Sequence, residues 1–287
     1  MHTMWKKLFV ALLGLIASGM LALRYGERRW QAETDELHAQ LAAARRPVAP
    51  QTYSADELVG LPAPVQRYFR AALTEGQPMV TDVTVAHTGT FNMDTASAQW
   101  KPFSSTQRVI TQRPGFDWEA RVVMLPGLSA RVHDAYIGGE GILHASMFGL
   151  VSVADLRGTP DAAHGELLRW FAEAAWYPTA LLPSQGVRWA AVDDRSATAT
   201  MQDGDTSVTL LFRFNAEGLI DSARAEARGA LIDGVSVPTP WQCSFSSYAL
   251  RDGMRVPIAG EVAWLFPAGP HSYWRGQITS IVYAFAP

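Results

Sequence analysis

A pair of histidines is the sharpest local grouping of chemically active side chains in the sequence. Gly138-Gly139 predicts a two-residue hairpin turn, which places His133 directly opposite His144 on neighbouring strands. Directly opposed side chains have Cβ atoms about 4.5–5.5 Å apart, close enough to share a metal ion or to titrate together. No third ligand stands at a metal-binding spacing, so ordinary strand histidines are favoured and no metal or cofactor is predicted.

Asp134 and Tyr136 fall on the opposite face of the same predicted strand. A lone buried carboxylate is costly, so Asp134 is expected to pair with an arginine such as Arg275 inside a cleft. This pair is either a polar anchor for a ligand headgroup or a structural pair that fixes the register of the sheet. Glu166 also has two interpretations: a general acid or base, or an acid in the first turn of a helix, where the dipole favours it.

Six tryptophans fall in predicted strands or at their ends: Trp100, Trp118, Trp189, Trp241, Trp264 and Trp274. Tryptophan combines a large apolar ring with one hydrogen-bond donor. These rings either pack the sheet against helices or line an apolar cleft that is open to a hydrophobic ligand. The predicted ligand-binding residues are Trp118, Asp134, Tyr136, Trp241, Trp264, Trp274 and Arg275.

Several classes of function are disfavoured. The sequence contains no nucleophile elbow, no phosphate-binding P-loop and no dinucleotide fingerprint that precedes a helix. A single cysteine, Cys243, excludes an internal disulfide framework and a cysteine-rich zinc site. The formal charge of -3 and the lack of a strongly basic stretch argue against nucleic acid as a partner.

The N-terminal residues predict a location at a membrane. Lys6 and Lys7 precede an uncharged apolar run over residues 8–23, which Arg24 ends. We favour an uncleaved signal anchor, a transmembrane helix over residues 1–26; a cleaved signal peptide and a buried soluble helix are the alternatives. Short N-terminal tails usually stay in the cytoplasm, so the rest of the chain is expected on the periplasmic or external side of the inner membrane.

Residues 27–52 are predicted to form a helical stalk followed by a proline-rich linker. Within residues 27–46, Trp30, Leu37, Leu41 and Ala44 recur with the spacing of a short oligomerising stripe. The alternative is a solvated stalk with one packed edge. The prolines at positions 47 and 50 favour a stiff linker.

Residues 53–287 are predicted to form a single β-rich domain. Apolar and polar residues alternate over residues 116–124 and again over 208–214, and turn dipeptides separate many short runs. Short strands joined by tight turns must be antiparallel neighbours, so the pattern predicts a curved meander of about ten strands. Helices over residues 54–75 and 161–176 are expected to fill its concave side, which gives a mainly β (α+β) half-barrel.

Several segments also carry a resemblance, including Leu61-Pro-Ala-Pro-Val-Gln-Arg-Tyr-Phe69, Trp100-Lys-Pro-Phe103, Pro114-Gly-Phe-Asp-Trp118, Asp134-Ala-Tyr136, Trp176-Tyr-Pro178, Pro238-Thr-Pro-Trp241 and Tyr273-Trp-Arg-Gly276. Over roughly residues 55–287 the chain resembles an uncharacterised bacterial family, a domain of unknown function, which implies no activity. In shape alone, the expected architecture is similar to bacterial lipoprotein-carrier (LolA-like) half-barrels, whose curved sheet holds acyl chains against helices.

Together these patterns predict a membrane-anchored, extracytoplasmic and non-catalytic domain that binds an apolar or lipid-like ligand. One alternative is a cell-envelope hydrolase, which needs titratable groups with shifted pKa values in one cleft. Another is a scaffolding protein that oligomerises through residues 27–46.

Overall fold

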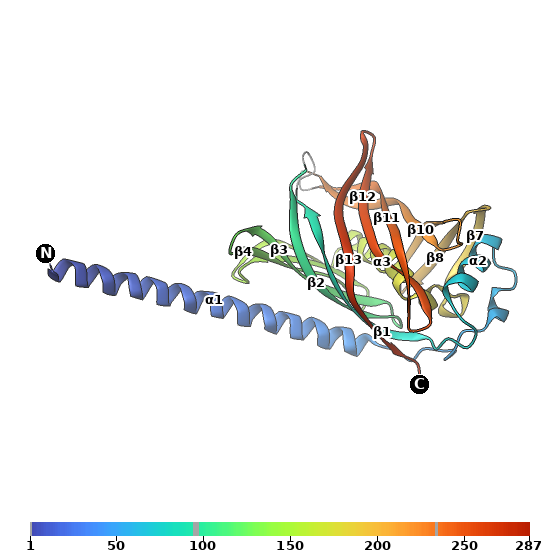
Figure 1. Ribbon diagram of the computed structural model, residues 1–287, viewed down its shortest axis with the longest axis horizontal. Helices are drawn as coiled ribbons and strands as arrows, with labels where there is room; N and C mark the ends of the chain where they lie inside the picture. Colours follow the sequence, from blue (N-terminus) through green and yellow to red (C-terminus); the bar gives the residue numbers. More distant parts are fainter. Residues whose placement is uncertain (1, 94–97, 233–234) are drawn as a thin grey trace.

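The computed structural model describes residues 2–93, 98–232 and 235–287, and its centre is one open, curved, antiparallel sheet (Figure 1). The sheet has 13 strands in the order β6-β5-β4-β3-β2-β1-β13-β12-β11-β10-β9-β8-β7, more than the ten or so predicted. The strands are β1 (Val80–Asn92), β2 (Trp100–Ile110), β3 (Gly115–Leu125), β4 (Leu128–Ile137), β5 (Glu140–Met147), β6 (Val151–Arg157), β7 (Arg188–Asp193), β8 (Ser196–Asp203), β9 (Thr206–Phe214), β10 (Ile220–Ile232), β11 (Val235–Arg251), β12 (Met254–Phe266) and β13 (Gly269–Phe285).

The predicted meander is confirmed with one change in its topology. Strands that follow one another in sequence are paired, except that β6 and β7 form the two outer edges and β1 pairs with β13 at the centre. The alternation predicted in β3 and β9 is also confirmed, because Phe116, Trp118, Val208 and Phe212 are all buried on one face of the sheet. Two meanders, each with an inward apolar face, therefore join through the first and last strands.

Short helices fill the concave side of the sheet. The predicted helix over 54–75 is a 3-10 turn (Ala55–Leu58) followed by α2 (Ala63–Ala72), because Pro62 and Pro64 permit a helix to start but not to continue through them. Helix α3 (Pro160–Glu173) begins at Thr159, whose side chain accepts a hydrogen bond from the Ala162 amide. It packs against β5, β9 and β10, as expected for a helix inside a half-barrel.

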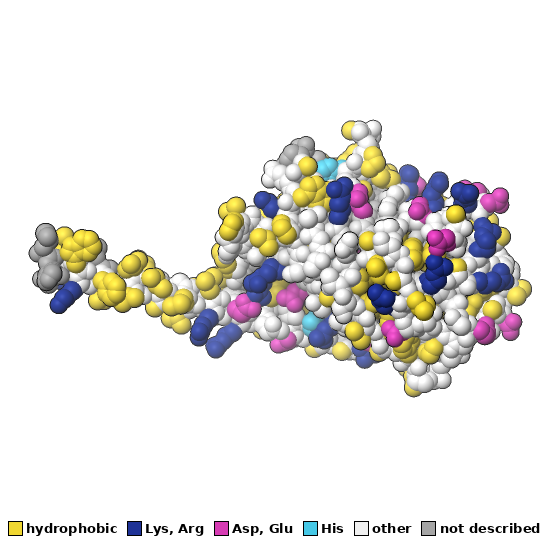
Figure 2. Space-filling model, in the orientation of Figure 1, with side chains coloured by type: hydrophobic (Ala, Val, Ile, Leu, Met, Phe, Trp, Pro, Cys, Tyr) yellow, Lys and Arg dark blue, Asp and Glu magenta, His cyan; other side chains and the backbone are white. Residues whose placement is uncertain are grey.

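Helix α1 (His2–Ala44) is one continuous helix of 43 residues that projects from the body of the molecule (Figure 1). Among the described residues it is the one helix that is long and apolar enough to cross a membrane, with a mean hydropathy of 1.9 and none of the apolar window buried. Figure 2 shows hydrophobic side chains along the projecting part and basic side chains where it reaches the body.

The second half of α1 packs on the convex face of the sheet, against β2, β3 and β4. Trp30, Leu37 and Leu41 are buried there, with 1%, 2% and 3% of their surfaces exposed. Residues 27–44 therefore have one packed edge, as the prediction of a solvated stalk with one packed edge allowed, and that edge packs on the sheet of the same chain. The stripe on which the oligomerisation hypothesis depended is covered by the sheet of the same chain.

A buried carboxylate holds α1 in place. Asp117 of β3 lies between two histidines: His133 Nδ1 is 2.9 Å from its Oδ1, and His38 Nε2 of α1 is 3.1 Å from its Oδ2. Burial alone would raise the pKa of Asp117, but its contacts with His133 and His38 outweigh burial and hold the pKa below its usual value. The buried charge therefore links the helix to β3 and β4.

The predicted histidine pair forms the other part of this contact. His133 and His144 are directly paired, as the Gly138-Gly139 turn predicts. The Trp30 indole stacks on both rings, with centroid distances of 4.5 Å and 5.5 Å, and its Nε1 donates a hydrogen bond to Glu119 at 2.7 Å. His144 Nδ1 lies 2.9 Å from Glu33 of α1. In the described part of the chain no group of three or more candidate ligands could hold a metal ion.

Replacement of the buried indole tests whether this contact holds the helix. We expect Trp30→Ala to destabilise the fold by about 3–5 kcal/mol, the usual cost of truncating a buried aromatic residue. We also expect trypsin to cleave more rapidly at Arg45 and Arg46, which follow the docked helix. Denaturant unfolding and timed trypsin digestion of the full chain in mild detergent measure the two effects.

Tyr25→Ala is the matched control, because Tyr25 lies on the same helix with 65% of its surface exposed. Equal stability and equal digestion rates for the two variants would show that the Trp30 contact does not hold the helix.

Candidate functional site

A large cavity opens on the concave face of the sheet, with a volume of about 1090 Å³. Ligand pockets usually measure about 300–1,000 Å³, so this one is at the large end of the range. Its walls come from both halves of the sheet and from α3. The aromatic and sulfur-containing residues that line it are Phe91, Met93, Trp118, Trp176, Trp241, Cys243, Phe245, Trp264, Tyr273 and Trp274.

The structure places five of the seven predicted ligand-binding residues on the walls of this cavity: Trp118, Asp134, Trp241, Trp264 and Trp274. They come from β3, β4, β11, β12 and β13, so residues from both ends of the chain meet here. The inward alternation of each strand explains this convergence, because each side chain points to the concave face.

Tyr136 is not among the cavity-lining residues, although it shares an inward face with Asp134. Its hydroxyl donates a hydrogen bond of 2.7 Å to Asp203 on β8, and Arg113 binds the other oxygen of the same carboxylate. This buried contact connects β4 to β8 across the interior. The prediction of Tyr136 as a cavity residue is therefore corrected to a structural role.

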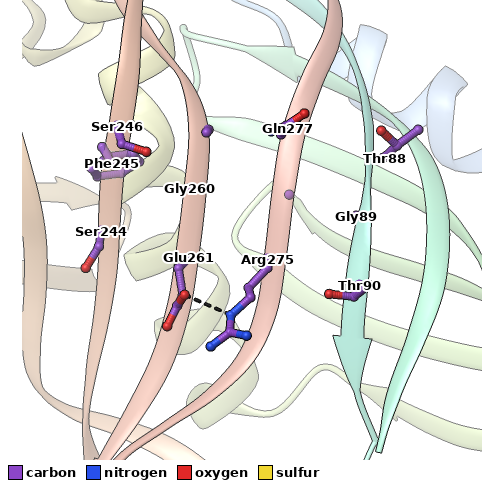
Figure 3. Close-up of a pocket in the computed structure, with 12 residues that line it drawn as sticks. Thr88, Gly89, Thr90, Ser244, Phe245, Ser246, Gly260, Glu261, Arg275 and Gln277 are labelled. Carbon is purple, nitrogen blue, oxygen red and sulfur yellow. Dashed lines mark hydrogen bonds and ion pairs between the residues drawn. The ribbon is translucent and has the colours of Figure 1, made fainter.

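Arg275 lies on the outer face of β13 rather than in the cleft. Its Nε is 2.9 Å from a carboxylate oxygen of Glu261, in a separate groove of about 720 Å³ (Figure 3). Its guanidinium carbon is 4.4 Å from the centroid of Trp100. The expected Asp134–Arg275 pair is therefore wrong, because Trp274 and Arg275 are consecutive in a strand and face opposite sides of the sheet.

The partner of Asp134 is Arg169 of α3, which also forms an ion pair of 2.8 Å with Glu173. A second pair joins Glu166 of α3 to Arg228 of β10 at 2.9 Å. These three carboxyls and two guanidinium groups form a buried charged wall of the cavity, whose remaining lining is mainly apolar but also includes Asp155, Asp161 and Glu261. With every group ionised, the set would carry a net charge of -1, from three negative and two positive charges.

Glu166 is the most strongly perturbed carboxyl of this wall. Burial raises its pKa to about 8, the nearby Asp134 carboxylate raises it as well, and the guanidinium groups of Arg228 and Arg169 only partly oppose the shift. Its Oε2 and the Oδ1 of Asp134 are buried without a hydrogen-bond partner in the described structure. Because Oε1 accepts from Arg228, the protonated Glu166 carboxyl is a donor at Oε2, whereas the Asp134 carboxylate is an acceptor.

Two indole rings and one tyrosine hydroxyl hold the Arg228 side chain against the cavity wall. Its guanidinium carbon lies 4.7 Å from the ring centroid of Trp241 and 5.8 Å from that of Trp264, and its Nη1 donates a hydrogen bond of 3.3 Å to the Tyr273 hydroxyl. Trp241 Nε1 donates to the same hydroxyl at 2.9 Å. Cation–π contacts of this kind are strongest where water is excluded.

A row of glycines leaves space for the Trp274 ring on the cavity wall. Gly89, Gly276 and Gly260 pair across β1, β13 and β12. A Cβ on Gly276 would lie 2.3 Å from the Trp274 ring, so a larger residue there would displace the indole. Sequence reasoning named Trp274 but not this glycine requirement.

Arg169 and Arg228 were not predicted from the sequence as cavity residues, and a different physical reason applies to each. A signal existed for Arg169, because Glu166, Arg169 and Glu173 recur at helical spacing within an otherwise apolar helix. No signal existed for Arg228, since the pairing of β10 with β11 shifts between Ala225 and Arg228. Such a bulge changes which side chains face inward, and strict alternation does not predict it.

A family model described as "Family of unknown function (DUF6920)" matches residues 59–283. This match covers most of the chain, and the protein belongs to that family. No curated protein matches the chain.

Two solved structures are distantly similar to the chain. "Crystal structure of LolA superfamily protein NE2245 from Nitrosomonas europaea" has 11% identity and a TM-score of 0.39, and the match covers 76% of this chain and 93% of that one. "Crystal Structure of Beta-barrel-like Protein of Domain of Unknown Function DUF1849 from Brucella abortus" has 11% identity and a TM-score of 0.21, with coverages of 72% and 99%.

The raised pKa of Glu166 gives a testable pH dependence. The carboxyl is protonated more readily in the folded than in the unfolded chain, so its contribution to stability is complete below about pH 4.5 and is lost as the pH rises through about 8. We expect Glu166→Gln to reduce the loss of stability over this window, by at most about 1.4 kcal/mol per pH unit. Denaturant unfolding of the full chain in mild detergent at a series of pH values measures it.

Glu217→Gln makes the same chemical change at an exposed carboxyl that pairs with Arg255 and does not line the cavity, and its pH profile provides the comparison. Parallel pH profiles for the wild-type protein and Glu166→Gln would contradict the assignment of the raised pKa.

Proposed function

We propose that this member of the DUF6920 family is a membrane-anchored binding protein that holds an apolar, lipid-like ligand in the concave cavity of its sheet. The observation that carries the proposal is the cavity itself, which is large, lined mainly by aromatic and aliphatic side chains, and has the buried ion pairs of α3 on one wall. This combination is typical of sites that bury the apolar part of a ligand and orient its polar end.

The charged wall favours a ligand whose polar end donates hydrogen bonds. Both arginines are already paired with carboxylates, so an anionic headgroup would have to displace those partners. The Asp134 carboxylate instead accepts hydrogen bonds at its unpartnered oxygen, and the protonated Glu166 carboxyl donates one at neutral pH. A hydroxyl group at the polar end of a lipid can donate to the first and accept from the second.

The anchor supports the same function. The exposed apolar half of α1 would hold the domain at a membrane surface, at raised effective concentration relative to the lipids of that membrane. Because short N-terminal tails usually stay in the cytoplasm, we propose that the domain lies on the periplasmic or external side of the inner membrane.

A hydrolase is the second candidate, and one observation favours it. Glu166 has a pKa of about 8, so it carries a proton at neutral pH, as a general acid must. The nearby Asp134 could serve as its ionised partner. Against this, both carboxyls form ion pairs with arginines, and no nucleophile motif is present in the sequence.

A tryptophan substitution tests ligand binding in the cavity. We expect Trp264→Ala to weaken binding of a phospholipid with a fluorophore on its acyl chain by about tenfold, which corresponds to about 1.4 kcal/mol of lost apolar contact. Fluorescence titration of the full chain in mild detergent measures it. Mass spectrometry of organic extracts from the wild-type and variant proteins compares the lipids that co-purify.

Trp100→Ala is the control, because it removes the same side chain from the outer face of the sheet, where Trp100 stacks on Arg275. If both variants bind the labelled lipid as the wild-type protein does and no lipid co-purifies, the binding proposal fails. Release of a cleaved lipid by the wild-type protein but not by Glu166→Gln would favour the hydrolase instead.

A further inference from the structure

The turn between β5 and β6 meets α1 where the helix leaves the body of the protein. A Cβ on Gly26 would lie 2.2 Å from the carbonyl oxygen of Phe148, and one on Gly149 would lie 2.3 Å from the carbonyl oxygen of Gly26. The backbones are therefore in direct contact. The apolar run ends at Leu23, so a rise of 1.5 Å per residue puts this contact roughly 4.5 Å beyond the end of the run.

The strands beneath α1 run along its length. From the N-terminal side, Trp30 contacts the middle of β4 and β5, and His38 contacts Asp117 farther along. Leu41 reaches the start of β3, where a Cβ on Gly115 would lie 2.9 Å from the leucine side chain. The β3–β4 and β5–β6 turns are thus at the end of the domain that faces the apolar half of the helix, as Figure 1 also shows.

These two turns carry exposed apolar side chains. Leu125 is 59% exposed, Phe148 is 41% exposed and Val151 is 61% exposed. Figure 2 shows a group of hydrophobic side chains at this end of the body, beside the projecting helix. Arg24 and Arg28 lie on either side of Gly26 in the sequence of α1. Each can attract an anionic headgroup, which contributes about 1 kcal/mol near a membrane surface.

Edge strand β6 leads from this end of the domain into the cavity. Val151 pairs with Met147, on the same face of β5 as the cavity-lining Leu143. The pairing of β5 with β6 shifts after this point, so that Ala154 pairs with Ala145 and Val153 is the extra residue of a bulge. Val153 and Ala154 both line the cavity, and Val153 is 58% exposed, so apolar residues continue along β6 from the turn to the cavity.

We propose that the β3–β4 and β5–β6 turns rest in the headgroup region of the membrane that α1 crosses, and that a lipid of that leaflet reaches the cavity along β6. The contact at Gly26 sets the depth of the turns in the membrane. It lies roughly 4.5 Å beyond the apolar run, and the headgroup region is about 5–8 Å thick on each side of the hydrocarbon core. The buried contacts of Trp30 and Asp117 supply the orientation, because they prevent the domain from turning about its anchor. This inference rests on the proposed anchor and the proposed apolar ligand.

Site-specific labelling of the full chain in nanodiscs tests the position of the turns. Cys243 is buried and burial raises the pKa of its thiol, so a cysteine added at an exposed position is labelled selectively. The variants Leu15→Cys, Phe148→Cys and Leu250→Cys place an environment-sensitive fluorophore on the apolar helix, on the β5–β6 turn and at the β11–β12 end. The nanodiscs contain phosphatidylethanolamine and phosphatidylglycerol, with a spin-labelled phospholipid as quencher.

We expect quenching at positions 15 and 148 and none at position 250. Quenching at position 15 without quenching at position 148 overturns the inference and leaves the anchor intact. Lack of quenching at position 15 removes the anchor and the inference together. A blue-shifted but unquenched label at position 148 shows that a second protein copy covers the turn, which also overturns the inference.

A photoactivatable phospholipid tests the path along β6. Adducts on cavity peptides are counted relative to adducts on the apolar helix in the same nanodisc. We expect Val151→Asp to lower this ratio at least about threefold, because a carboxylate is costly in an apolar lipid path. Val151 is not among the cavity-lining residues.

Val235→Asp is the matched control on the β10–β11 hairpin, where Val235 is 62% exposed. An unchanged ratio for Val151→Asp, or an equal fall for both variants, overturns the path along β6. A cavity without adducts in the wild-type protein would instead contradict the proposed ligand, whatever the labels on the turns report.

Discussion

The buried carboxylate of Asp117 fixes the relation between the apolar helix and the cavity. Asp117 belongs to β3, and both histidines that contact it, His133 from β4 and His38 from α1, approach from the convex side. A buried charge without partners is strongly unfavourable, so α1 cannot leave without exposing or stranding this group. Buried ion pairs contribute little net stability but strongly favour one arrangement over others. Here they favour the arrangement in which the long apolar helix α1 lies on the convex face of the sheet.

The two faces of the sheet use polar groups in opposite ways. On the convex face, the Trp30 ring stacks on His133 and His144. The carboxylates there form ion pairs or hydrogen bonds across the contact between α1 and the sheet. On the concave face, the carboxyls of Asp134 and Glu166 keep one oxygen each without a partner. Because an unsatisfied buried polar group costs about 1–3 kcal/mol, a ligand that donates to Asp134 and accepts from the protonated Glu166 would offset this cost. We therefore propose the concave face as the ligand-binding face.

Much of the fold was predictable because alternation and turn residues act locally. The Gly138-Gly139 turn alone predicted the pairing of His133 with His144, and the pattern of β3 predicted which face is buried. The docked position of α1 was not predictable in the same way, since its stripe fits a second helix and the surface of a sheet equally well. The apolar spacing of α1 shows that one face of the helix is buried, but it does not show against what. The contacts of α1 with Asp117 and Glu119 identify β3 as the surface that covers this face. Those two residues lie far from α1 in sequence, so the sequence pattern does not reveal them.

The ion pairs of the charged wall were also difficult to predict from the sequence. A long-range pair can be inferred from the cost of burying a carboxylate, but the choice of Arg169 over Arg275 depends on which side of a strand each residue faces. One residue decides that face, and a bulge reverses it, as it does before Arg228. The aromatic residues were easier to place because a large apolar side chain is driven inward on any strand, while an arginine is stable on either face if a carboxylate is near. The aromatic lining of the cavity could thus be predicted from the tryptophans, whereas the ion pairs of its polar wall became visible only in the structure.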